Sequence, residues 1–166
     1  MQTARDDVIY ALKIYNDIPA MIAEEWATIR NCEEQRDKVG TTAAQLREVV
    51  QESGGKYGDK TADLATKDHE ALFQREIDDR LAHIDELRRT REWLRQGLAC
   101  IDEKDRYILS LAYIGPQDAS QRCAWRGKGW KEISTFVGLS ASNTRHRAYK
   151  ALDKVKTVAP KKVRHL

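Results

Sequence analysis

Apolar side chains recur along the first forty residues at the spacing of a helical stripe. The steps between them are three or four residues, which places one apolar face on a helix of heptad character. The stripe consists of Val8, Leu12, Tyr15, Ile18, Ile22, Trp26 and Ile29. Pro19 lies within this pattern and predicts that the helix is kinked or divided near Ile18. Gly40 is expected to end the helix.

A second apolar stripe predicts another long helix, which starts at Thr61 or Asp68 and ends near Gly97. Its members are Phe73, Ile77, Leu81, Ile84, Leu87, Leu94, Leu98 and Ile101. Between the stripes, residues 41–51 suggest a short helix, and the glycines of residues 51–60 predict a flexible loop. The two long helices therefore favour an antiparallel, coiled-coil-like hairpin. Its remaining apolar surface, with Trp26 and Trp93, would dock a second copy as a homodimer.

The last third of the chain predicts three shorter helices. The first covers Asp102–Ile114, with Asp102 as N-cap and Gly115 at its end. The apolar face of the second consists of Trp130, Ile133, Phe136 and Val137. Gly138 supplies the positive φ of a sharp reversal, and Ser140 caps the third helix, which is strongly basic. A helix, a glycine turn and a basic helix are the pattern of a helix-turn-helix.

Charge is distributed unevenly over the 166 residues, whose formal net charge is +3. Residues 121–166 contain 12 basic and 2 acidic side chains, whereas residues 1–120 contain 17 basic and 24 acidic ones. The basic end coincides with the predicted helix-turn-helix, which favours a nucleic-acid-binding segment joined to a different body. No apolar run reaches the ~20 residues of a membrane span, and no signal peptide is visible, so a cytoplasmic protein is expected.

Candidate chemistry is sparse. Cys32, Cys100 and Cys123 are odd in number and lack Cys-x-x-Cys spacing, which argues against disulfides and a zinc site. Cys32 and Cys100 are expected to act as small apolar side chains. The carboxylates of the second long helix are typical of an exposed charged face, and no histidine or nucleophile is placed beside them by spacing. We therefore expect no enzymatic activity, no metal and no cofactor.

Three sequence features follow one another from residue 102 to residue 155. An acidic opening precedes Arg-Tyr-Ile-Leu-Ser-Leu-Ala-Tyr, then comes Trp-Lys-Glu-Ile-Ser-x-x-Val-Gly-Leu-Ser, and a basic helix ends in Lys-Ala-Leu-Asp-Lys-Val. This segment resembles region 4 of bacterial sigma-70-type factors. In layout, the whole chain is similar to small phage regulators of the RinA/ArpU type.

The resemblance implies sequence-specific binding to double-stranded DNA and activation of phage late genes with RNA polymerase in a bacterial host. It places base-reading positions at Ala141, Ser142, Asn143, Arg145 and His146. The full set of expected DNA contacts is Lys128, Lys131, Ser140, Ser142, Asn143, Arg145, His146, Arg147, Lys150 and Lys154. Accessory contacts are expected from Arg122, Trp125 and Arg126, where cations flank a tryptophan.

The segment departs from the family pattern at Thr144 and Arg147, where aliphatic residues are usual. Docking of the basic helix is therefore expected to rest on Thr144, Ala148, Ala151, Leu152 and Val155. Arg147 would then face DNA, and the helix would be held loosely at its middle. The connection at residues 116–128 is also longer than the tight connection usual in region 4.

The expected architecture is all-α in three parts. Residues 1–100 would form the helical hairpin with its flexible loop at 51–60, residues 101–158 the helix-turn-helix domain, and residues 159–166 a basic tail. Two other functions fit the same pattern. A small terminase-like DNA-packaging subunit also joins a helix-turn-helix to an oligomerising coiled coil, and a protein-interaction adaptor would use the basic helix on an acidic partner without DNA.

Overall fold

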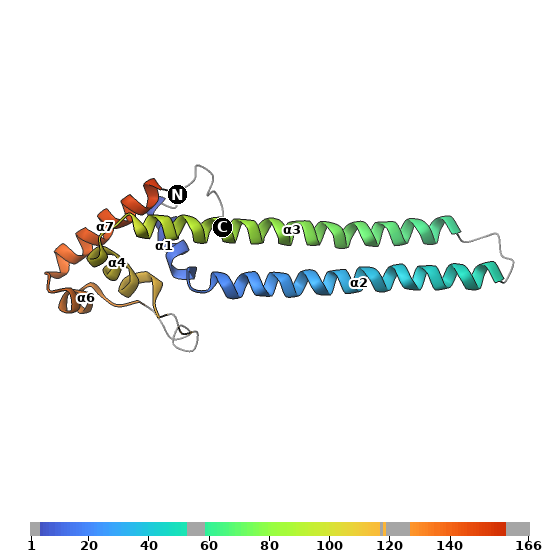
Figure 1. Cartoon of the computed structure of the whole chain (residues 1–166), viewed down its shortest axis with the longest axis horizontal. Helices are drawn as coiled ribbons and strands as arrows, with labels where there is room; N and C mark the ends of the chain where they lie inside the picture. Colours follow the sequence, from blue (N-terminus) through green and yellow to red (C-terminus); the bar gives the residue numbers. More distant parts are fainter. Residues whose placement is uncertain (1–3, 53–58, 117, 119–126, 159–166) are drawn as a thin grey trace. The chain divides into compact units, whose positions relative to one another are not determined.

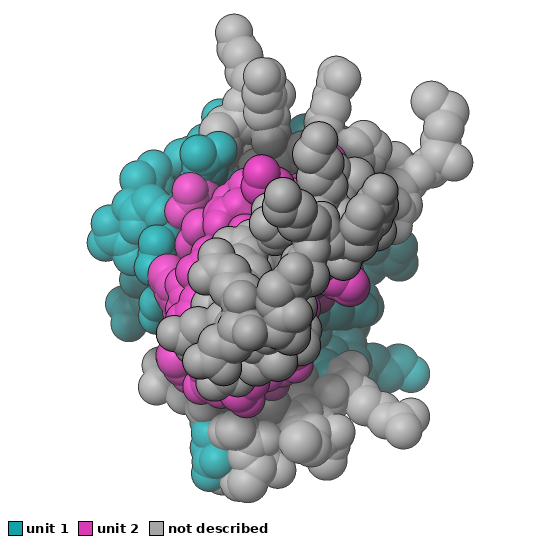
Figure 2. Space-filling view, turned by 90° about the vertical axis from the view of Figure 1, so that its right-hand side faces the viewer, with its two compact units in different colours: residues 1–19, 87–166 teal, residues 20–86 magenta. Residues whose placement is uncertain are grey.

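The structure, a computed structural model, describes residues 4–52, 59–116, 118 and 127–158. All regular secondary structure in these residues is helical, which confirms the predicted all-α class (Figure 1). The chain divides into two compact units, which Figure 2 colours separately. Unit 1 consists of residues 1–19 and 87–166, and unit 2 consists of residues 20–86. None of the described helices has the length and apolar content needed to cross a membrane.

This division corrects the predicted boundary at residue 100. The first helix, α1 (Ala4–Ile14), belongs to unit 1 together with the last part of α3 (Asp59–Ala99). Spacing alone shows that a helix has an apolar face but not which partner covers it, and here the ends of the expected hairpin pack with the C-terminal helices instead. The predicted tail at 159–166 and most of the predicted loop at 51–60 lie outside the described residues.

Pro19 divides the first apolar stripe as predicted. A turn at residues 15–17 separates α1 from α2 (Ile18–Glu52). Pro19 then lies in the first turn of α2, where its missing N–H leaves no intrahelical hydrogen bond unmade.

Gly40 does not end α2, which continues to Glu52 and absorbs the short helix predicted at 41–51. A single interior glycine costs only about 1 kcal/mol, so good helix formers on both sides outweigh it. The hydroxyls of Thr41 and Thr42 donate to the carbonyl oxygens of Asp37 and Lys38 at 2.8 and 2.9 Å, as they do in continuous helix.

Unit 2 contains a small apolar core between α2 and α3, which lie side by side in Figure 1. Ile29, Ile77 and Ile84 are its buried members, and Ile22 and Cys32 pack against them. Trp26 and Leu81, which belong to the same two apolar stripes, are 36% and 39% exposed. Trp26 therefore keeps apolar surface in solvent, as the sequence predicted.

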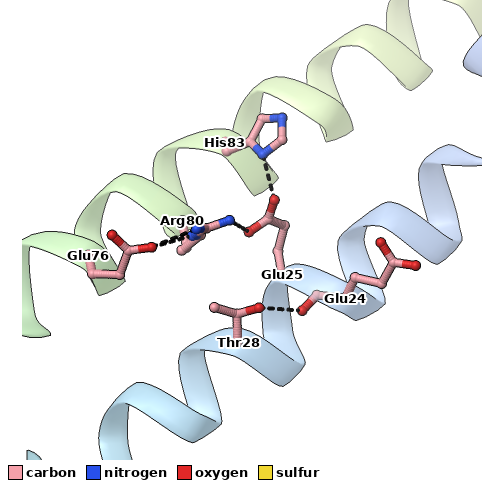
Figure 3. A network of polar contacts seen from close by, with 6 residues as sticks. All are labelled: Glu24, Glu25, Thr28, Glu76, Arg80 and His83. Atoms are coloured by element: carbon pink, nitrogen blue, oxygen red, sulfur yellow. Dashed lines mark hydrogen bonds and ion pairs between the residues drawn. The ribbon is translucent and has the colours of Figure 1, made fainter.

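A polar network beside this core connects the two helices (Figure 3). Glu25 on α2 accepts one hydrogen bond from Arg80 at 3.1 Å and contacts Nδ1 of His83 at 2.8 Å, both on α3. Arg80 also pairs with Glu76 on its own helix. Burial alone would raise the pKa of Glu25, but the hydrogen bonds with His83 and Arg80 lower it below its ordinary value. Glu25 is therefore held as a carboxylate.

Unit 1 contains the larger core, which gathers apolar side chains from every helix of the unit. Its largest fully buried members are Val8, Leu12, Leu94, Ile108, Leu109, Ile133, Leu152 and Val155. Trp93, expected on a free surface, is only 4% exposed, and its Nε1 donates to the carbonyl oxygen of Val155 at 3.2 Å. Trp93 is thus part of the fold of unit 1 and is not available to a second copy.

The helix predicted at 102–114 has two parts. Asp102 lies at the N-cap position of α4 (Glu103–Leu109), although its side chain makes no capping hydrogen bond. The chain then continues as the π-helix η1 (Ser110–Ile114) and ends at Gly115, whose φ is 73°. The side-chain amide of Asn16 donates to the carbonyl oxygens of Ile114, Gly115 and Pro116 at 3.2–3.4 Å, which fastens this end to the α1–α2 turn.

Candidate nucleic-acid interface

Two helices and a three-residue turn form the most basic part of the described chain. The first is α6 (Trp130–Val137) and the second is α7 (Ala141–Thr157). Between them Gly138 has φ 67° and ψ 37°, the left-handed conformation that glycine adopts without a Cβ penalty. Ser140 accepts a hydrogen bond from the backbone N–H of Asn143 at 3.2 Å. The predicted reversal at Gly138 and the predicted N-cap at Ser140 are both confirmed.

One face of α7 is buried in the core of unit 1. Its fully buried residues are Thr144, Ala148, Ala151, Leu152 and Val155, the five expected to carry the docking of this helix. Thr144, which replaces an aliphatic residue of the family pattern, satisfies its hydroxyl within the helix by donating to the carbonyl oxygen of Ser140 at 2.9 Å. The hydroxyl therefore does not need water, and the helix is firmly seated at this position.

The opposite face of α7 carries most of the predicted contact residues. Exposed on it are Ser142, Asn143, Arg145, His146, Lys150, Lys154 and Lys156, and Ser140 is exposed at the cap. By helical spacing they occupy the arc of α7 that the buried stripe leaves free, with Arg145 at the edge of this arc next to Leu152. The structure thus brings the base-reading and phosphate-contacting candidates of α7 together on one surface, which we call the outer face of α7.

Arg147 departs from this set. Its Nε donates to the carboxylate of Asp105 on α4 at 2.6 Å, and its Nη2 lies 3.8 Å from Asp102. The side chain of Asp105 is 9% exposed and that of Arg147 is 32% exposed. The hydrogen bond to Asp105 raises the pKa of Arg147. The predicted DNA-facing role of Arg147 is therefore corrected to an internal ion pair, and this pair holds the middle of α7 that was expected to be loose.

The lysines near α6 differ from one another. Lys128 contacts Glu132 through its ammonium group, which also lies 5.1 Å from the ring centroid of Phe136. Phe136 was predicted to be buried, but it is 56% exposed because α6 buries Ile133 and Val137 instead, so Lys128 partly covers its ring. Lys131 is exposed. The accessory residues Arg122, Trp125 and Arg126 lie outside the described residues.

The outer face of α7 includes one carboxylate, Asp153, among five basic residues of the helix. Arg5 on α1 binds this carboxylate with two hydrogen bonds of 2.8 and 2.6 Å. The hydrogen bond from Arg5 lowers the pKa of Asp153, so the carboxylate is ionised and its charge is balanced. Sequence patterns give no signal for this pair, because its members are 148 residues apart.

Three aromatic side chains form a row that ends at Tyr149, which contacts Arg145 of the outer face. Tyr113, Trp130 and Tyr149 form two edge-to-face contacts with ring centroids 6.2 and 6.3 Å apart. The Nε of Arg145 donates to the hydroxyl of Tyr149 at 3.1 Å. Tyr149 was not among the predicted contact residues, although its i, i+4 spacing from Arg145 was a visible signal.

The described residues show no metal-binding arrangement. No group of three or more His, Cys, Asp or Glu side chains among them is placed to hold an ion. Cys32 and Cys100 are free thiols, and Cys100 is exposed rather than packed as predicted. What the described surface presents instead is a seated helix whose free face is polar and cationic. No family model, no curated protein and no solved structure matches the chain.

Proposed function

We propose that the chain is a sequence-specific DNA-binding protein in which α6 and α7 act as a helix-turn-helix and α7 enters the major groove. The observation that carries this proposal is the outer face of α7. It offers amide, imidazole, guanidinium and ammonium groups, and its one carboxylate, Asp153, is balanced by Arg5. Such a face complements base edges and phosphates.

The order of side chains along α7 suits the division of labour in a recognition helix. Asn143, Arg145 and His146 lie in its first two turns, where recognition helices contact base edges. Arginine pairs bidentately with guanine and asparagine with adenine. Lys150 and Lys154 follow further along, where ammonium groups would contact phosphates without reading sequence.

The role in transcription rests on the resemblance of residues 102–155 to sigma region 4. We propose that the protein regulates promoters, as an activator of phage late genes acting with RNA polymerase in the cytoplasm of a bacterial host. Under the terminase-like alternative the protein would form ring oligomers. Under the adaptor alternative the basic helix would bind an acidic partner protein without DNA, and no DNA sequence would be selected.

Unit 2 supports a homodimer in this proposal. Its buried core consists of three isoleucines, and Trp26 and Leu81 remain partly exposed beside it. A two-fold dimer would cover these side chains and would contain two copies of α7, and helix-turn-helix dimers bind paired half-sites. The expected operator is then a pseudo-palindrome, with half-sites about one helical turn, ~34 Å, apart.

Selection from random duplex oligonucleotides tests the proposal, and the expected result is one enriched sequence. Arg145→Ala should relax preference at one base pair of that sequence by about 1–3 kcal/mol and leave the other positions unchanged. Lys150→Ala should weaken binding to every sequence alike and reduce the salt slope by about one. The proposal fails if the wild-type protein enriches no sequence. An enriched sequence whose preferences survive Arg145→Ala would show that α7 is not the reading helix.

A further inference from the structure

Arg145 is held by one residue of its own helix. Tyr149 lies one turn later on α7, and its hydroxyl accepts the hydrogen bond of 3.1 Å from the Nε of Arg145. The Cζ of Arg145 lies 5.3 Å from the centroid of the Tyr149 ring, within the range of a cation–π contact. The guanidinium is thus bound to Tyr149 both through its inner nitrogen and through the ring.

The Tyr149 ring is itself fixed from another helix. Trp130, the first residue of α6, contacts it edge to face at 75°, and Tyr113 of η1 contacts Trp130 in the same way at 73°. Tyr149 also packs against the core of unit 1. A side chain held by core contacts keeps its rotamer. The hydroxyl of Tyr149 therefore has a defined position, and so does the Arg145 side chain that is hydrogen-bonded to it.

A second guanidinium, that of Arg5, lies over the same ring. Its positive charge is balanced by a carboxylate, so it does not repel Arg145. The Cζ of Arg5 is 5.4 Å from the ring centroid of Tyr149, and the charge of Arg5 is balanced by its two hydrogen bonds to Asp153. The ring therefore has cationic contacts from α1 and from its own helix, and both limit its motion. The Tyr149 ring is therefore held in place before any DNA binds.

The hydrogen bond to Tyr149 determines which guanidinium nitrogens of Arg145 can still donate to DNA. Its Nε is committed to Tyr149, and its two Nη groups make no hydrogen bond to any described residue. Two adjacent donors match the paired O6 and N7 acceptors of guanine in the major groove. Adenine places a donor where guanine has O6, so the same pair of donors would reject it.

We propose that Tyr149 is a positioning residue for base recognition, which fixes Arg145 so that its two Nη groups meet O6 and N7 of a guanine. This inference rests on the proposed function and deepens it, because it names the base that Arg145 reads and the residue that aims it. Tyr149 touches no base itself. Its contribution is the preorganisation of a long side chain that would otherwise sample many rotamers.

The test uses the full-length protein and its selected operator, with every base substituted at the position that depends on Arg145. That base should be guanine. Tyr149→Phe keeps the ring and removes the hydroxyl, and it should reduce the preference for guanine at that position roughly three- to tenfold. Binding to random duplex and preferences at the other positions should not change. In an Arg145→Ala background, Tyr149→Phe should have no further effect.

Tyr107→Phe is the matched control, because Tyr107 is an exposed tyrosine of α4, outside the aromatic row, and the same atom is removed. It should leave guanine preference at the wild-type value. Should Tyr149→Phe fail to fold, Arg145→Lys tests the same geometry on an exposed side chain. Lysine lacks the paired donors, so it should lose the guanine preference while random-duplex binding persists.

The inference is overturned if Tyr149→Phe leaves the preference intact, if it weakens all sequences equally, or if Arg145→Lys still selects guanine. It is also overturned if the base read by Arg145 is not guanine. In each of these cases the operator itself remains, so the proposed function survives. If the wild-type protein selects no operator, the proposed function fails and this inference fails with it.

Discussion

Replacing Arg147 by alanine should destabilise unit 1, although Arg147 belongs to the basic helix expected to face DNA. The substitution removes the partner of Asp105, whose carboxylate is almost fully buried and accepts the 2.6 Å hydrogen bond from Arg147. An ionised carboxylate that is buried without its partner costs far more than the loss of an exposed ion pair.

The magnitude follows from how far water can replace Arg147. Breaking a fully buried pair costs about 3–5 kcal/mol, and an exposed pair contributes about 0–1 kcal/mol. Asp105 is close to the first case, whereas the 32% exposure of Arg147 opens a path for water after truncation. We therefore expect a loss of about 2 kcal/mol, which lowers the melting temperature of a domain of this size by about 8–16 °C.

Urea unfolding followed by circular dichroism measures this loss. Arg145→Ala is the matched control, because it truncates an exposed arginine on the same helix and should change stability by no more than about 0.5 kcal/mol. In the double variant Arg147→Ala with Asp105→Asn, the neutral amide should recover about 1 kcal/mol, since no buried charge is left without a partner. Equal stability of Arg147→Ala and the wild-type protein would refute this reasoning, as would equal losses from the two arginine variants.

Two further substitutions test the packing and the charge of the fold. Gly97→Ala should cost about 1–3 kcal/mol in urea unfolding, because the new Cβ would lie 2.8 Å from Cγ1 of Val155, and an unchanged midpoint would disprove this close approach of α3 and α7. Glu25→Gln should destabilise the protein at neutral pH, where the lowered pKa of Glu25 keeps its carboxylate bonded to Arg80 and His83. A carboxyl group with a lowered pKa contributes stability that is lost on acidification. The difference in unfolding free energy between the variant and the wild type should therefore shrink once the pH falls below 4.5, the ordinary pKa of this carboxyl group. A difference that does not depend on pH would contradict the network.

Local signals in the sequence were sufficient for the turn and for the buried face of α7. Gly138 and Ser140 act within a few residues of themselves, so their conformation and capping follow from residue type and position alone. The buried face of α7 also follows from helical spacing, because Ala148 and Leu152 recur one turn apart. The division at Pro19 has the same local origin.

Other features were decided by contacts between residues distant in sequence. Arg147 looked like a DNA contact because its partner Asp105 lies 42 residues away on another helix. Trp93 looked like free surface because nothing near it in sequence indicates that α7 covers it. Gly40 failed as a stop signal because the neighbouring residues favour helix by more than one glycine costs.

The sequence by itself therefore determined the helices, their apolar faces, most of the turns between them and the concentration of positive charge near the C-terminus. These depend on interactions over a few residues and on composition. The tertiary structure decided which helix covers each apolar face, and hence that α1 and the end of α3 belong with α7. It also decided which cations are engaged, because pairs such as Arg5 with Asp153 form only when the chain has brought them together.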